Sequence, residues 1–127
     1  MMDLNGLKST NDNIGHEAGD ELIIGAAKCM SNAFSSLGKV YRVGGDEFVA
    51  LLKGTKESVE GSVTTFDYLT SNFKGKFISE LSVSKGVVVC AEHIGLSFEE
   101  LKAMADKLMY ADKDEYYRRT GKNRRRV

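Results

Sequence analysis

Residues 44–48 are two glycines, two acids and a phenylalanine, and this run constrains the fold of the 127-residue chain more than any other. It lies between two runs rich in β-branched, aromatic and aliphatic residues, 40–43 and 48–52. Such runs joined by a glycine-containing turn are typical of a β-hairpin. We therefore expect antiparallel strands with Gly44 to Phe48 at the tip, where glycine allows a tight turn and the close approach of another group.

Asp46 and Glu47 in this hairpin are adjacent acids, and their charges repel each other. A divalent cation would offset the repulsion, because hard oxygen ligands suit Mg²⁺ and Mn²⁺, and Mg²⁺ typically uses one or two carboxylates together with substrate phosphates. An ordinary glycine-rich turn with solvated acids explains the same residues equally well. The hairpin alone leaves both interpretations open.

A second group of polar residues lies near the N-terminus. Its members are Asp3, Asn5, Lys8, Asn11, Asp12, His16 and Asp20. Taken singly, each has an ordinary explanation as a helix cap, a turn residue or a solvated surface charge. Four residues separate His16 from Asp20, so on a helix their side chains would share one face. Their joint occurrence with the acidic hairpin favours a binding site.

Hydrophobic periodicity predicts the remaining elements. Apolar residues at three- and four-residue steps indicate helices over about 18–37 and 56–73. Residues 77–78 and 81–89 are β-type, and Ser97 begins a capping box that opens a final helix. The residues expected on the inner face of this helix are Leu101, Met104, Ala105, Leu108 and Tyr110. This order predicts an α/β (α+β) sandwich of the ferredoxin-like or nucleotide-cyclase-like type, with an antiparallel sheet flanked by helices.

Composition indicates one cytoplasmic domain. At 42% hydrophobic residues the chain can build one modest core, and its 18 basic and 18 acidic residues predict no general attraction to nucleic acid or membrane. We interpret the arginine-rich C-terminus as a solvated tail. We interpret Cys29 and Cys90 as buried core thiols of a protein in a reducing compartment. No signal peptide or membrane-length apolar stretch is present in this segment, so any sensor or anchor would precede it.

The chain resembles the GGDEF family of diguanylate cyclases in the order, type and spacing of its polar residues. The resemblance is carried by 3–8, Asn11-Asp12, Gly15-His16, Gly19-Asp20, 42–48 and 108–113. It covers residues 1–127 as one domain and implies an enzyme that condenses two GTP molecules into cyclic di-GMP and pyrophosphate. The two half-sites would come from two subunits of a homodimer. Positioning and electrostatic stabilisation by carboxylate-bound metal suit this chemistry.

The resemblance also implies metal-binding and catalytic roles. Asp3 and the Leu4 carbonyl would bind Mg²⁺ (or Mn²⁺), and Asp46 would be the facing ligand. Asp46 is also the position proposed to accept the 3′-hydroxyl proton, with Glu47 as a second-metal ligand or alternative base. Adjacent acids around metal titrate as a coupled set, so the two roles stay unseparated.

Nucleotide contacts follow in the same way. Asn11 and Asp20 would hydrogen-bond guanine, since an aspartate accepts from its N–H groups and an amide supplies both donor and acceptor. His16 would lie close to the nucleotide and shape the pocket. Gly44 and Gly45 would give the nucleotide clearance to approach the strand.

The resemblance implies phosphate contacts from the N-terminal segment and from the C-terminal part of the chain. Gly6, where the family often has phenylalanine, and Leu7 would turn backbone N–H groups toward the β- and γ-phosphates. Lys8 and Lys113 would lie against the triphosphate as point charges, with Lys8 counted among the catalytic residues. Arg124 is the distal arginine we assign to the same role.

Two departures from the family pattern bear on regulation and folding. Many members carry an Arg-x-x-Asp motif that binds dimeric product, whereas residues 35–38 here are Ser-Ser-Leu-Gly. We therefore expect no product inhibition through that site. Family domains also begin earlier, so we expect that most of the first, central strand and an upstream sensor domain are absent from this sequence. The alternatives to an active cyclase are a catalytically inactive module or a fragment that binds GTP for signalling.

Overall fold

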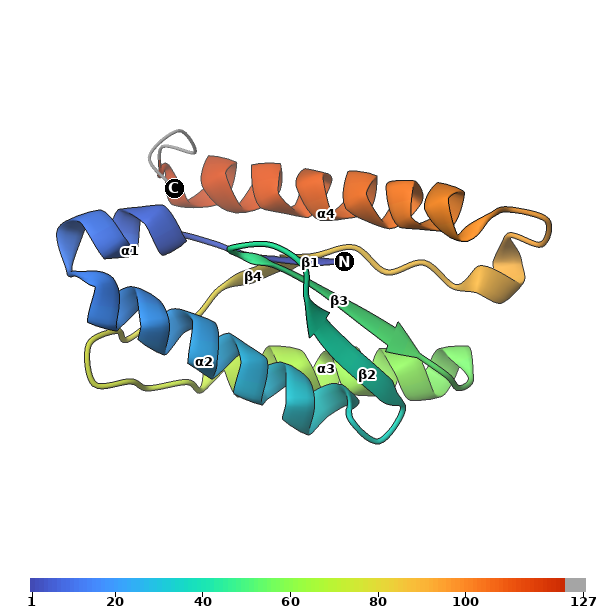
Figure 1. The fold of residues 1–127 in the computed structure, drawn as a ribbon, viewed down its shortest axis with the longest axis horizontal. Coiled ribbons are helices and arrows are strands. Elements are labelled where there is room, and N and C mark those ends of the chain that lie inside the picture. Colours follow the sequence, from blue (N-terminus) through green and yellow to red (C-terminus); the bar gives the residue numbers. More distant parts are fainter. Residues whose placement is uncertain (123–127) are drawn as a thin grey trace.

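The computed structural model describes residues 1–122 as four helices and a short 3-10 turn around a four-stranded antiparallel sheet. The elements are β1 (Met2–Leu4), α1 (Leu7–Asn13), α2 (His16–Phe34), β2 (Gly38–Arg42), β3 (Glu47–Leu52), α3 (Lys56–Ser71), β4 (Val83–Lys85), η1 (Cys90–Glu92) and α4 (Phe98–Thr120). Helices α2 and α3 cover one face of the sheet and α4 crosses the other (Figure 1). The expected α/β sandwich is confirmed.

The sheet has the strand order β2-β3-β1-β4, so the first strand of the chain lies inside it. Strand β1 has three residues and pairs on both sides, Asp3 with Glu47 of β3 and with Ser84 of β4. Its register with β3 ends where Met2 faces Phe48, while β3 itself continues to Leu52. Asp3 therefore lies on a short central strand, with β3 on one side and β4 on the other.

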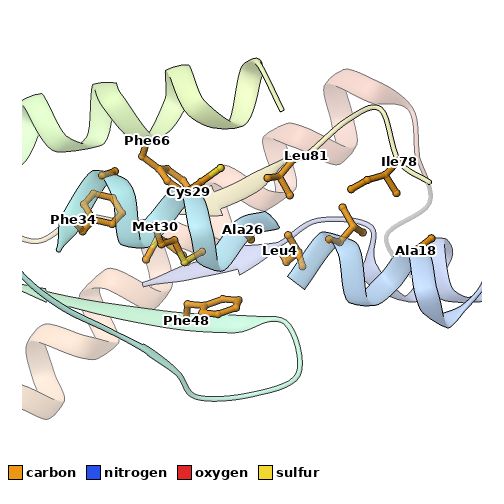
Figure 2. Packing of buried hydrophobic residues seen from close by; sticks show 13 residues of the cluster. Leu4, Ala18, Ala26, Cys29, Met30, Phe34, Phe48, Phe66, Ile78 and Leu81 are labelled. Carbon is orange, nitrogen blue, oxygen red and sulfur yellow. The ribbon is translucent and has the colours of Figure 1, made fainter. Parts of the chain in front are cut away.

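The main core lies between the sheet and the α2–α3 layer. Helix α2 supplies the apolar stripe that its periodicity predicts, including Met30, which is fully buried. Phe34 and Phe66 bring α2 and α3 together, with ring centroids 5.4 Å apart. Leu4 and Phe48 close the cluster from the sheet side (Figure 2).

The inner face of α4 differs from the expected one. Its buried residues repeat every four positions: Ala105, Met109, Lys113 and Tyr117. Leu108 and Tyr110, expected inside, are 49% and 45% exposed. The prediction placed only apolar side chains on the inner face. The helix instead turns Lys113 and Tyr117 inward, because the edge of the sheet beneath them carries Asp3. The predicted capping box at Ser97 is confirmed.

Helix α1 was not expected, because its seven residues bury no side chain and carry no apolar stripe. Three other expectations need correction. Cys90, expected as a core thiol, is exposed at the start of η1, whereas Cys29 is buried as expected. Glu47 and Phe48 belong to β3 rather than to the hairpin tip, which is residues 43–46. Of the β-type residues 77–78 and 81–89, only Val83–Lys85 forms a strand.

The segment before β4 is a loop because a side chain from α2 takes its backbone donors. Glu21 accepts hydrogen bonds from the backbone N–H groups of Lys76, Phe77 and Ile78 at 2.8, 2.9 and 2.9 Å. Burial acts to raise the pKa of Glu21, but these three donors outweigh it and the pKa is lowered. The carboxylate thus replaces the sheet as the acceptor for this stretch.

Candidate functional site

Three carboxylates meet at the end of β1. Carboxylate oxygens of Asp3, Asp46 and Glu47 lie within 4.8 Å of one another. Pairing of Asp3 with Glu47 brings β3 alongside β1, and the Leu4 backbone N–H donates to the Asp46 carbonyl at 2.8 Å, which fixes the end of the turn. Residues more than 40 positions apart are therefore united by strand pairing alone.

Asp3 is buried, at 4% exposure, and an ion pair accompanies it. Its Oδ1 lies 3.0 Å from Nζ of Lys113, which reaches it from α4 and is itself buried. Burial raises the pKa of Asp3 to about 6, the Lys113 ammonium opposes that rise, and the Asp46 charge adds to it. The pair holds an acid at the sheet edge where desolvation alone would neutralise it.

The turn that carries Asp46 is held by the arginine preceding it. Arg42 donates from Nε to the carbonyls of Gly44 and Gly45, both at 3.2 Å, and from Nη2 to Gly45 at 2.8 Å. Neither glycine has a positive φ, so the turn does not depend on the left-handed conformation. Gly45 faces open space, since a Cβ added there would have no neighbouring atom within 4 Å. The approach to the turn is therefore unobstructed on that side.

A sharp backbone turn follows β1 directly. Gly6 has φ +78°, a conformation that a side-chain-bearing residue rarely adopts, and it is the N-cap of α1. Leu7 begins the helix, so both residues lie at its first turn beside the acidic cluster. Lys8 lies one position further on and is exposed.

The residues expected to bind guanine lie where α1 packs against α2. The Asn11 side chain rests on the backbone of Gly19, since a Cβ at Gly19 would come within 1.7 Å of Asn11 Oδ1. Asp20 is the next residue and is exposed. His16, also exposed, is the first residue of α2 and lies one turn before Asp20. Asn11 of α1 thus lies against the residue of α2 that precedes Asp20.

Two hollows of the surface lie away from the carboxylates. One of about 430 Å³ runs between the sheet and α4 and is largely apolar, with Val49, Val88 and Leu101 among its lining. A second, of about 590 Å³, lies between α2 and the loop that follows α3, and its lining includes Asp20 and Phe73. Neither is lined by the acidic cluster, which sits at an open edge.

The chemistry of the donors fits a divalent cation. All three groups are carboxylates, the oxygen ligands that Mg²⁺ and Mn²⁺ prefer. Oδ1 of Asp3 is buried and makes no hydrogen bond within residues 1–122, although the Lys113 ammonium lies against it as an ion pair. A buried oxygen with spare acceptor capacity suits a cation.

Sequence reasoning overlooked two residues of this region. Tyr117 lies one turn after Lys113 and is buried, and Arg42 holds the turn as described. A four-residue spacing from Lys113 was the only signal for Tyr117, and nothing in the sequence identified a turn-capping role for Arg42. Arg124, assigned to phosphate binding, lies outside the described residues.

Comparison with known proteins gives a consistent result. The family model for "Diguanylate cyclase, GGDEF domain" matches residues 1–119. The signaling protein YkoW of Bacillus subtilis is 33% identical in an alignment 126 residues long, which covers 90% of this chain and 15% of that protein. The diguanylate cyclase VdcA of Vibrio cholerae is 31% identical in an alignment 121 residues long, which covers 90% of this chain and 35% of that protein.

Solved structures agree on the fold. An EAL/GGDEF domain protein from M. capsulatus superimposes with a TM-score of 0.73 at 32% identity, covering 90% of this chain and 76% of that one. A sensory box/GGDEF family protein from Caulobacter crescentus gives a TM-score of 0.70 at 28% identity over 90% and 76% of the two chains. The chain spans less than two thirds of the length of the curated relatives it matches.

Across residues 1–122, no helix is both long and apolar enough to cross a membrane.

Proposed function

The chain belongs to the GGDEF family of diguanylate cyclase domains, and we propose that it condenses two GTP molecules into cyclic di-GMP. In each of two steps a ribose 3′-oxygen attacks the α-phosphorus of the other nucleotide, the bond to pyrophosphate breaks, and the 3′-hydroxyl loses its proton. The observation that carries the proposal is the convergence of Asp3, Asp46 and Glu47 beside a positive-φ glycine turn.

Divalent metal, Mg²⁺ or Mn²⁺, would be held by Asp3, Asp46 and the Leu4 carbonyl. When bound it would neutralise phosphate charge and align the triphosphate. The fit rests on the buried Oδ1 of Asp3, which has acceptor capacity to spare. The Lys113 ammonium, 3.0 Å from that oxygen, keeps Asp3 oriented toward the edge of the sheet.

Proton removal from the 3′-hydroxyl falls to two adjacent acids, Asp46 in the turn and Glu47 at the start of β3. Asp46 and Glu47 are half-buried and only partly solvated, so either carboxylate could accept the proton. Carboxylate oxygens of Asp46, Glu47 and Asp3 lie within 4.8 Å of one another, so both candidate bases lie beside the carboxylate of Asp3. The base is therefore the pair of adjacent acids, with Asp46 as its first member.

Substrate binding would use the segment between β1 and α2. The Gly6 and Leu7 N–H groups are at a helix start, where unsatisfied backbone donors favour anions, and Lys8 adds charge next to them. We assign Lys113 and Arg124 to the same phosphates. Guanine would lie against Asn11 and Asp20, whose proximity through Gly19 supports the assignment, with His16 and the clearance at Gly44 and Gly45 shaping the pocket.

Two chains would be needed for turnover. Each contributes one acidic cluster and one nucleotide, and the reaction joins two nucleotides, so we propose a homodimer with facing half-sites. Curated relatives extend beyond the matched region, which supports a sensor segment that controls this pairing in a longer protein.

A direct assay tests the proposal. The purified chain is incubated with GTP and Mg²⁺, and product is separated by chromatography. We expect cyclic di-GMP from the parent chain and at least a roughly hundredfold loss in Asp46→Asn, because a charged group acting on the reacting atoms is removed. Glu60→Gln, an exposed acid on α3, is the matched control and should keep full activity.

The alternative function is binding without turnover. GTP that binds tightly to the parent chain, measured by calorimetry, with no product over hours would support a signalling module. Failure of GTP to bind at all would contradict both functions. The intact set of acids favours the cyclase, since a binding module has no need of a base beside the metal ligands.

We propose that cyclic di-GMP does not inhibit the enzyme through residues 35–38, where many family members carry the Arg-x-x-Asp motif. Gly38, at the position where the family motif places its aspartate, packs so closely that a Cβ would come within 1.9 Å of the Leu51 carbonyl oxygen. We expect micromolar cyclic di-GMP to leave the initial rate unchanged in a titration at fixed GTP. Strong non-competitive inhibition would contradict this expectation.

A further inference from the structure

Tyr117 carries a hydroxyl proton for which the fold supplies no acceptor. Its side chain is 6% exposed, and within residues 1–122 the buried hydroxyl has the Gly6 backbone N–H beside it as a donor but no acceptor for its own proton. Buried hydroxyl groups are normally paired, because an unpaired one loses its hydration without replacement. An unsatisfied hydroxyl at the edge of a binding site therefore points to a ligand.

The surroundings of this hydroxyl identify the ligand's chemistry. The Gly6 backbone donor belongs to the turn at the start of α1. The Lys113 ammonium lies 3.0 Å from Oδ1 of Asp3 and 6.0 Å from the centroid of the Tyr117 ring. The Tyr117 side chain is therefore near both this turn and the acidic cluster. Burial raises its pKa to about 12, so it stays protonated at neutral pH and can donate.

The ring is held in place by its neighbours. Tyr116 packs edge-on against it with centroids 4.9 Å apart, and Nζ of Lys113 lies 6.0 Å from its centroid. These contacts restrict the ring on two sides, so the direction of the hydroxyl is set before any ligand arrives. A fixed donor loses less entropy on binding than a mobile one.

We propose that Tyr117 is a substrate-positioning residue whose hydroxyl donates a hydrogen bond to a terminal phosphate oxygen of the bound nucleotide. The inference rests on the proposed function and adds to it a neutral donor facing the Gly6–Leu7 turn. A phosphate oxygen is an acceptor that matches a protonated phenol, and such charge-assisted bonds are short and strong. The purine base, assigned to Asn11 and Asp20, would not depend on this contact.

The test is Tyr117→Phe, which keeps the ring and removes only the oxygen. Calorimetric titrations with GTP and with guanosine, both with Mg²⁺, are compared with those of the parent chain. We expect GTP affinity to fall about tenfold, as for loss of a hydrogen bond to a charged group, and guanosine affinity to stay the same. The KM for GTP should rise with little change in kcat.

Tyr116→Phe is the matched control. Its hydroxyl accepts a hydrogen bond from Nζ of Lys122 at 3.0 Å, so it has a partner of its own, and its removal should leave GTP affinity unchanged. The melting temperature of Tyr117→Phe should equal or exceed that of the parent chain, because a buried hydroxyl whose proton has no acceptor has been removed.

Three results would overturn the inference. Equal GTP affinity in Tyr117→Phe and the parent chain would make the hydroxyl irrelevant to phosphate. An equal fall for GTP and guanosine would indicate a general structural role. If the parent chain bound no GTP, the proposed function would fail and the inference with it, whereas the first two results leave the proposed function intact.

Discussion

The two faces of the sheet are built for different purposes. On one face α2 and α3 bury an entirely apolar cluster that includes Leu4, Met30 and Phe66. On the other face α4 buries Ala105 and Met109 with Met1, and then continues its inward stripe with Lys113 and Tyr117. The first face packs apolar side chains along its whole length. On the second face, two of the four buried residues of α4 are polar, namely Lys113 and Tyr117.

This difference separates stability from chemistry within one small domain. The apolar face needs only complementary volume, so many hydrophobic sequences would satisfy it. The polar half of the α4 face carries Lys113 and Tyr117, and Lys113 must be a cation because the buried carboxylate of Asp3 lies beneath it. Substitutions on the two faces should therefore fail in different ways.

The largest effect is expected on the apolar face. Phe66→Ala removes a ring that is 1% exposed and packs on Phe34, and it should lower the free energy of unfolding by about 4 kcal/mol. Urea denaturation followed by circular dichroism measures this. Tyr68→Ala, on the same helix at 68% exposure, should change stability by less than about 0.5 kcal/mol. Equal losses in both variants would refute the assigned core.

A smaller and pH-dependent effect is expected on the polar face. Lys113→Met leaves the Asp3 charge buried without its cation and should cost about 3 kcal/mol at pH 7 in metal-free buffer. Burial already raises the pKa of Asp3 to about 6, and without Lys113 it should rise further. Urea midpoints and NMR titration of the Asp3 carboxyl, at matched pH values, measure both quantities.

The sign of this pH dependence follows from linkage. A carboxyl whose folded pKa is raised favours the folded state when protonated, so its contribution falls as pH rises from the unfolded value, 3.8, to the folded value. In Lys113→Met that falling window should extend above pH 6. Lys107→Met, an exposed lysine on the same helix, should reproduce the parent curve. A parent-like curve for Lys113→Met would rule out the ion pair as the stabilising contact.

The smallest effect is expected where a charge anchors a loop beside the apolar face. Glu21→Gln weakens the acceptor for the backbone N–H groups of residues 76–78, so these amides should exchange faster at pH 7. Because its pKa is lowered below 4.5, protection in the parent chain should persist above that pH and disappear as pH falls through the lowered value. Glu17→Gln, exposed one turn earlier, should leave hydrogen exchange unchanged.

Much of this architecture could be predicted from local pattern. Periodicity located α2 and α3 within a few residues, and Ser97 with Glu100 marked the start of α4 through their reciprocal hydrogen bonds. Helix α1 escaped detection because it buries nothing, and Phe77 and Ile78 were assigned to a strand because β-type composition does not reveal that Glu21 takes their donors.

The sequence by itself determined the antiparallel hairpin, the apolar stripe of α2 and the family, because each depends on residue types at fixed spacing along the chain. Only the tertiary structure decided which residues meet. Strand pairing placed Asp3 beside Asp46 and Glu47, and the docking of α4 turned Lys113 inward in place of Leu108. Such contacts depend on the register between distant segments and on the cost of burying an unpaired charge, which no local spacing encodes.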